Sequence, residues 1–144
     1  GLRFDALAKP PQLPALLRLL DRHPELAVVI DHGGKPEIAT RAWEPWAGCI
    51  AALARSPRVE CKLSGLATEA GPGWTLDAFR RYFEHLLECF GPGRLLWGSD
   101  WPVVDVCGGY RRWWVATGTL LSGLAVADRE AILGGNARRV YGLD

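Results

Sequence analysis

The chain has 144 residues, of which 49% are hydrophobic. This length and composition suit one domain with a substantial apolar core and are too small for two domains of ordinary size. With 17 basic and 16 acidic residues the formal net charge is +1, which gives no electrostatic basis for binding nucleic acid or an anionic membrane. The apolar stretch 13–20 contains Pro14 and Arg18, so it is excluded as a signal peptide or a membrane span.

The cysteine spacing excludes the common zinc and redox motifs. Cys49, Cys61, Cys89 and Cys107 form no Cys-x-x-Cys pair, so we expect reduced, mostly buried thiols and a cytoplasmic protein. The chain begins with Gly1 and contains no methionine. We therefore expect it to be a fragment of a larger fold.

Two strand and helix units are predicted in the first part of the chain. Residues 2–8 predict a strand, and residues 12–21 predict a helix whose leucines recur along one stripe. Residues 27–32 form a nearly continuous apolar run, typical of a strand buried on both faces, and residues 43–55 predict the helix that follows.

Two further units complete the pattern. A strand at 59–64 leads through a glycine- and proline-containing loop to a helix at 76–90, whose apolar residues follow the 3.6-residue period. A strand at 94–100 precedes a helix at 110–121. Two short helices, roughly residues 127–133 and 137–141, are expected to close the chain, with Asn136 as the N-cap of the second.

Strands that alternate with helices predict an α/β fold with a parallel sheet and right-handed crossovers. Four such units fit a small open sheet, and they fit equally well one half of a (β/α)8 TIM barrel, which usually has about 250 residues. Periodicity alone does not choose between these architectures. In both of them ligands bind at the carboxyl ends of the strands.

The fourth strand delivers a carboxylate to that end of the sheet. The apolar run 95–97 leads through Gly98 to Asp100, and Pro102 ends the strand just beyond it. If side chains alternate along the strand, Asp100 shares a face with Leu96 and Gly98. Taken alone, Asp100 is also well explained as a turn or helix N-cap residue.

Polar residues end two other strands. His32 ends the second strand, on the face of its even-numbered residues, while Glu60, Lys62 and Ser64 lie along one face of the third. An isolated histidine there is commonly structural, and Lys62 could simply pair with Glu60 or Asp5. However, an imidazole, an ammonium, a hydroxyl and a carboxylate at one edge are a set suited to hydrolytic acid and base chemistry.

Four motifs occur in order along the chain: Val-Ile-Asp-His-Gly-Gly-Lys-Pro at 29–36, Cys-Lys-Leu-Ser-Gly-Leu at 61–66, Leu-Leu-Trp-Gly-Ser-Asp-Trp-Pro at 95–102 and Asn-Ala-Arg-Arg-Val-Tyr-Gly at 136–142. Together they resemble the amidohydrolase-2 family of the metal-dependent hydrolase superfamily, and most closely its sugar-lactonase-like branch. The resemblance implies that residues 1–144 form a single half-barrel domain, the C-terminal half of a TIM barrel with strands five to eight. The His-x-His motif of the family's first strand is absent from this sequence.

The resemblance also implies roles for individual residues. Asp100 would activate the attacking water, and His32 would polarise the substrate carbonyl or help to hold the site. Lys62, Ser64 and Trp101 would contact the substrate. In metal-bearing members His32 and Asp100 would also bind one divalent metal such as zinc, but the strand-five histidine of such members is missing, so a reaction without metal is equally open.

The implied activity is the opening of a sugar lactone or related cyclic ester. Half a barrel leaves unpaired strand edges and an apolar surface exposed. Besides a small-molecule substrate we therefore expect a homodimer or a complementary N-terminal half-barrel chain as partner. The alternative is a catalytically inert half-barrel that acts as a structural or oligomerisation module, and the sequence leaves open whether this chain by itself is an enzyme.

Overall fold

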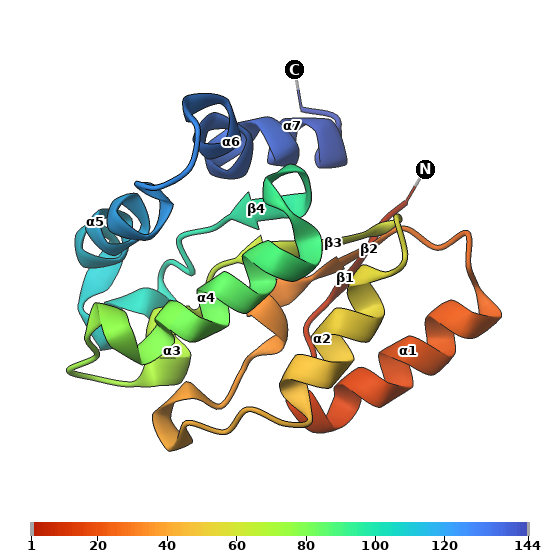
Figure 1. Ribbon diagram of the computed structural model, residues 1–144, viewed down its shortest axis with the longest axis horizontal. Coiled ribbons are helices and arrows are strands. Elements are labelled where there is room, and N and C mark those ends of the chain that lie inside the picture. The colour runs from red at the N-terminus through yellow and green to blue at the C-terminus, as the bar shows by residue number, and fades with distance from the viewer. Residues whose placement is uncertain (1, 144) are drawn as a thin grey trace.

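The computed structural model describes residues 2–143 as one sheet of four parallel strands with helices on both faces (Figure 1). The strands, in their order across the sheet, are β1 (Phe4–Ala6), β2 (Val28–Ile30), β3 (Val59–Leu63) and β4 (Leu95–Trp97). Sequential strands are therefore neighbours, and each connection crosses over through helices. The predicted α/β class with four consecutive βα units is confirmed.

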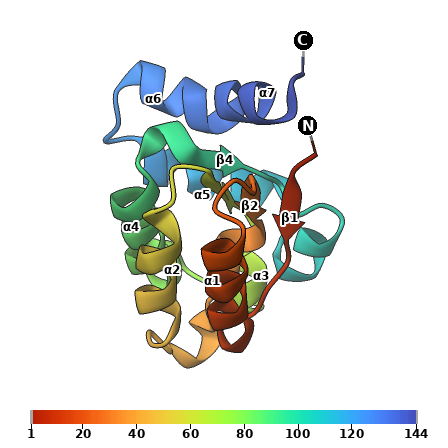
Figure 2. The ribbon, with the colours of Figure 1, turned by 90° about the vertical axis from the view of Figure 1, so that its right-hand side faces the viewer.

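Three helices cover one face of the sheet (Figure 2). They are α1 (Leu13–Arg22), α2 (Trp46–Ala54) and α4 (Leu76–Phe90). The helix α5 (Gly109–Leu121) follows β4, and a short helix, α3 (Leu66–Ala70), lies where we expected only a loop. Short 3₁₀ turns join these elements at Pro10–Gln12, Asp31–Gly34, Ile38–Thr40, Pro92–Arg94 and Val103–Cys107.

The strand register explains why one face of the sheet is apolar. Ala6, Ile30, Cys61 and Leu95 are aligned in one row across the four strands, and all four side chains are buried. This apolar face packs against the helix stripes that the 3.6-residue period predicts. Because burial disfavours the thiolate, the pKa of Cys61 is raised, as expected for a structural thiol. All four cysteines are free, two of them buried and two half-buried.

The opposite face of the sheet, called the polar face below, is covered by the C-terminal segment (Figures 1 and 2). This segment is α6 (Val126–Glu130), a π-helical turn (Ala131–Gly135) and α7 (Asn136–Tyr141). The strand residues of the polar face are Asp5, Val29, Glu60, Lys62 and Leu96.

Two contacts attach α7 to the polar face. Val140 packs with Val29 and Leu96 in a small apolar cluster. Arg139 Nη1 lies 3.0 Å from Oε1 of the buried Glu60, which neutralises a carboxylate that burial would otherwise make costly. The C-terminal helix is therefore part of the sheet's packing.

The expectation that Asn136 caps a separate helix is wrong. Helical backbone continues through the π-helical turn into α7, and Asn136 itself has helical φ and ψ. Its side-chain amide instead donates to the carbonyl oxygens of Pro92 and Leu95, at 2.7 and 2.8 Å. Asn136 thus holds the C-terminal segment against the start of β4. None of the helices within residues 2–143 combines the length and the apolarity needed to cross a bilayer.

Candidate active site

A left-handed turn sets the position of His32. The strand β2 ends at Ile30, and His32 follows with φ 53° and ψ 40°, a conformation that few residues other than glycine adopt. The prediction that His32 shares a face with the even-numbered residues of this strand is therefore wrong, because alternation stops before the histidine. The turn directs the imidazole to the carboxyl ends of the neighbouring strands.

Asp100 also has a left-handed backbone, with φ 58°. It lines the same cavity as Leu96 and Gly98, although Trp97, which alternation places on the other face, lines it too. Its side chain caps no helix, since the 3₁₀ turn after it has no side-chain cap hydrogen bond. The turn interpretation therefore explains the backbone of Asp100 but not its carboxylate.

His32 and Asp100 meet in a cavity of about 350 Å³ on the polar face. Besides these two residues, the cavity is lined by Asp31, Lys62, Ser64 and Tyr141 among others. Strand ends and α7 thus enclose it together. The structure brings together four of the five site residues that the sequence predicts, and it leaves Trp101 outside, with 68% of its surface exposed.

Hydrogen bonds fix both reactive groups. His32 Nδ1 lies 2.8 Å from the hydroxyl oxygen of Ser64, so Nε2 is the ring nitrogen that faces Asp100. His32 Nε2 and Asp100 Oδ1 are 3.6 Å apart, which is too long for a hydrogen bond. The hydroxyl of Thr68 donates to Asp100 Oδ2 at 2.6 Å. Oδ1 of the carboxylate and Nε2 of the ring therefore remain for a ligand.

Lys62 belongs to an ion-pair network below these two groups. Its Nζ lies 2.6 Å from Asp31 Oδ1 and 2.8 Å from Asp5 Oδ2, and the hydroxyl of Tyr141 lies 3.0 Å from Asp5. Burial alone would lower the pKa of Lys62, but its hydrogen bonds to Asp31, Asp5 and Tyr141 outweigh this and raise the pKa. The pairing with Asp5 considered from the sequence is present, whereas Glu60 pairs with Arg139 instead.

Three further residues of the site were not predicted: Asp31 and Tyr141 line the cavity, and Thr68 joins the site through its hydrogen bond to Asp100. Asp31 adjoins His32 in its motif, so the sequence carried a signal for it. Thr68 lies on the unpredicted helix α3, and Tyr141 comes from the far end of the chain. Only the folded arrangement places a threonine hydroxyl and a phenol beside the strand ends.

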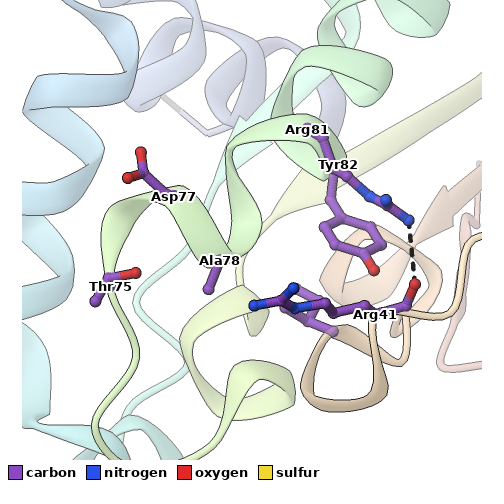
Figure 3. Close-up of a pocket in the computed structure, with 7 residues that line it drawn as sticks. Arg41, Thr75, Asp77, Ala78, Arg81 and Tyr82 are labelled. Atoms are coloured by element: carbon purple, nitrogen blue, oxygen red, sulfur yellow. Dashed lines mark hydrogen bonds between the residues drawn. The ribbon is translucent and has the colours of Figure 1, made fainter.

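A second cavity, of about 360 Å³, lies between the loop after β2 and the start of α4 (Figure 3). Arg81 is held there, because its Nη2 donates to the carbonyl of Arg41 at 3.2 Å and its guanidinium stacks on Trp43. The one carboxylate that lines it belongs to the exposed Asp77. Without an imidazole or a paired base among its lining residues, this cavity does not match acid and base chemistry.

Metal binding would need more donors than this cavity offers. No group of three or more His, Cys, Asp and Glu side chains within residues 2–143 is arranged to hold an ion. His32 and Asp100 supply two donors, whereas zinc sites in proteins take at least three protein ligands.

The chain is similar to enzymes of known family. The family model described as Amidohydrolase matches residues 1–143. An L-fucono-1,5-lactonase of Burkholderia ambifaria is 43% identical over 99% of this chain and 51% of its own length, and one of Burkholderia multivorans is 36% identical over 97% and 51%. The chain spans about half the length of the curated relatives it matches.

A solved structure supports the same relationship. An amidohydrolase from Burkholderia multivorans, determined with bound zinc, superposes with a TM-score of 0.92 at 36% identity, covering 97% of this chain and 52% of that one. A second amidohydrolase, from Bifidobacterium longum subsp. infantis, gives a TM-score of 0.75 at 27% identity over all of this chain and 51% of that one. The four parallel strands are thus half of a larger barrel fold in these relatives.

Proposed function

Because the chain belongs to the amidohydrolase family, we propose that it forms half of a lactonase that opens a sugar lactone with water activated by Asp100. The observation that carries this proposal is the pair formed by His32 Nε2 and Asp100 Oδ1, 3.6 Å apart at the carboxyl ends of parallel strands. The curated relatives that act on L-fucono-1,5-lactone favour an aldonolactone as the substrate class.

Asp100 acts as the general base in this proposal. Thr68 occupies Oδ2, which leaves Oδ1 to accept a proton from the attacking water. The water oxygen bonds to the lactone carbonyl carbon, and the carbonyl oxygen becomes an oxyanion. As the intermediate collapses, the ring C–O bond breaks and the proton held by Asp100 passes to the departing ring oxygen. The product is an open-chain hydroxy acid, and the carboxylate is restored.

His32 faces the developing oxyanion. When the Ser64 hydroxyl donates to Nδ1, the ring proton is on Nε2, which can then donate to the oxyanion. Lys62 is less suited to this role, because Asp5 and Asp31 already neutralise its charge. We assign Lys62 to binding substrate hydroxyl groups at the bottom of the cavity.

Ser64 and Trp101 remain the other proposed substrate contacts. The Ser64 hydroxyl is buried and engaged with His32, so when its proton is given to Nδ1 it can meet a substrate only as an acceptor. Trp101 is exposed beside Asp100, where a loop of a partner could enclose it over the substrate.

One divalent ion is also compatible with this site. His32 and Asp100 would be two of its ligands, and the remaining donors would come from the half of the barrel that the relatives possess and this chain lacks. Such an ion would supply Lewis-acid polarisation of the lactone carbonyl. Its binding would require the lone pair of Nε2, and hence the ring proton on Nδ1 with Ser64 as the acceptor.

We propose that the partner is a complementary half-barrel and not a second copy. Within residues 2–143 no further strand pairs with the outer edges of β1 and β4, and apolar side chains are exposed at both ends of the sheet. Near β1 these are Leu2, Phe4 and Leu7, and on α5 they are Tyr110, Trp114 and Val115. Four further βα units would cover both ends.

The position of α7 argues against a symmetric dimer. This helix lies across the polar face, which would face the interior of a closed barrel. An eight-stranded barrel has an interior just wide enough for side chains, and a helix is about 10–12 Å across. A second copy would bring a second such helix to the same narrow barrel, so the two helices would compete for one place.

The proposal is tested by assaying hydrolysis of a panel of aldonolactones, with this chain alone and with a complementary half, after chelation and after addition of Zn²⁺. Turnover that needs both halves is expected. If a folded, assembled barrel opens no lactone under either metal condition, the activity is refuted and the inert structural module becomes the better explanation.

A further inference from the structure

We infer that residues 64–69, the corner between β3 and α3, position both reactive groups, with Ser64 setting the tautomer of His32 and Thr68 orienting the carboxylate of Asp100. Both are positioning residues, which act through another side chain. The inference rests on the proposed role of Asp100 as the base, and it makes the two contacts used there the positioning function of one short segment.

The corner contacts His32 at two points. The Ser64 hydroxyl lies 2.8 Å from Nδ1, and Gly65 packs directly against the ring. A Cβ at Gly65, where φ is 69°, would lie 2.7 Å from His32 Cβ and 2.8 Å from Cγ, which is closer than carbon atoms tolerate. Only glycine fits at position 65. The imidazole of His32 is therefore held by the hydrogen bond between Nδ1 and Ser64 and by the close approach of the Gly65 backbone.

The same corner reaches the fourth strand. Thr68, the third residue of α3, donates its hydroxyl to Asp100 Oδ2 at 2.6 Å. Glu69 forms an ion pair with Lys35, which follows the left-handed turn that carries His32. The corner is thus tied to the segment after β2 on one side and to the segment after β4 on the other.

The contacts of this corner restrain two side chains that the strands themselves do not hold. His32 and Asp100 both leave their strands through left-handed turns, so no ladder hydrogen bonds hold them at their separation of 3.6 Å. A misplacement of about 1 Å can cost two orders of magnitude in rate. Ser64 and Thr68 supply the missing constraints from one short segment.

The first test uses ¹⁵N NMR of the imidazole rings in this chain, without any assay of activity. We expect Ser64→Ala to change the tautomer signature of His32, while His23 and His85 serve as unchanged internal references. A His32 tautomer that is the same in wild type and Ser64→Ala overturns the assignment of Ser64. Because no turnover is measured, this result is independent of the lactonase proposal.

The second test concerns Thr68. Thr68→Val keeps the shape but removes the donor, and we expect kcat of the assembled enzyme to fall about tenfold or more with KM nearly unchanged, since a hydrogen bond to a carboxylate is worth roughly that factor. Thr68→Ser should restore most of kcat. Thr119→Val is the matched control, because the Thr119 hydroxyl donates only to a carbonyl within α5.

The Thr68 assignment is wrong if Thr68→Val keeps its kcat, or if Thr68→Ser is as impaired as Thr68→Val in a folded protein. The carboxyl ¹³C resonance of Asp100, assigned with Asp100→Asn, gives a readout that does not need turnover. A shift in Thr68→Val but not in Thr119→Val supports the positioning role even if no lactone is hydrolysed.

Discussion

At the scale of single residues, the site depends on two backbone conformations that most side chains avoid. His32 and Asp100 have φ values of 53° and 58°, and such conformations cost about 1–3 kcal/mol each. They persist because hydrogen bonds to Ser64 and Thr68 hold the two side chains. Strain at these positions therefore accompanies the placement of an acid and an imidazole in one cavity.

Asp100→Asn should separate the chemistry from the fold. Asparagine tolerates the left-handed conformation well and can still accept from Thr68, so the melting temperature should change little. Lactone hydrolysis by the assembled enzyme should fall by about 10²–10⁴-fold, the usual contribution of a general base. The matched control is Asp105→Asn, an exposed carboxylate five residues away that is outside the cavity. Equal losses in both variants would contradict the role given to Asp100.

The sequence predicted which residue types meet in the cavity but not how they are held. The ends of β2, β3 and β4 identify His32, Lys62, Ser64 and Asp100 because parallel strands bring their carboxyl ends together. Alternation of side chains along β2 predicted the wrong face for His32, because the strand ends at Ile30 and a left-handed turn follows. The sequence pattern of the strand does not indicate such a turn. No sequence pattern identified Thr68, because its contact with Asp100 depends on how α3 packs beside the end of β4.

At the scale of elements, α7 supports the sheet on the side that the strands' polar residues occupy. The strongly periodic helices were predicted closely, and α4 was predicted at its observed bounds of Leu76–Phe90. The C-terminal segment was predicted as two separate helices, with Asn136 as the N-cap of the second. The structure continues between them as a π-helical turn, since Asn136 and Val140 hold the segment against β4.

Asn136→Ala should loosen this support. Its amide donates to two carbonyl oxygens, of Pro92 and Leu95, and leaving them unpaired should lower the free energy of unfolding by about 1–3 kcal/mol. Urea denaturation measures this difference. Asn136→Asp is the comparison, because a carboxylate placed against two carbonyls should be at least as destabilising. An alanine variant as stable as wild type would show that these bonds do not hold α7.

Lys62 should make the fold sensitive to alkaline pH. Its pKa is raised in the folded chain, so the folded state binds the proton more tightly than the unfolded state. This contribution is fully present below the unfolded value of about 10.4 and is lost as the pH rises above it. The pKa of Tyr141 is also raised, chiefly by burial, and acts in the same direction.

Urea unfolding at several pH values between 8 and about 11 tests this linkage. Lys62→Met should lower stability at pH 8, because Asp5 and Asp31 lose their shared cation, and it should flatten the decline above about pH 10. The exposed Lys9 gives the control variant, Lys9→Met. A decline of equal steepness in wild type and Lys62→Met would rule out Lys62 as its source.

At the scale of the whole molecule, helices cover both faces of the sheet, but the sheet ends at two strand edges that no further strand of residues 2–143 pairs with. The sheet is covered by α1, α2 and α4 on its apolar face and by α7 on its polar face, while the outer edges of β1 and β4 pair with no strand among the described residues. The parallel fold followed from the alternation of strands and helices in the sequence. Periodicity could not decide between an open sheet and half a barrel, and the choice came from relatives about twice as long.

A hybrid barrel would show whether this half of the fold supplies the catalytic base of a lactonase. This chain would replace the matching half of the Burkholderia ambifaria L-fucono-1,5-lactonase, to which it is 43% identical, and the initial rate of L-fucono-1,5-lactone hydrolysis would be measured with and without Asp100→Asn. We expect the folded hybrid to open the lactone and Asp100→Asn to lower its rate by about 10²–10⁴-fold. A folded hybrid that hydrolyses the lactone equally well with asparagine at position 100, or that binds it without any turnover, would contradict the account.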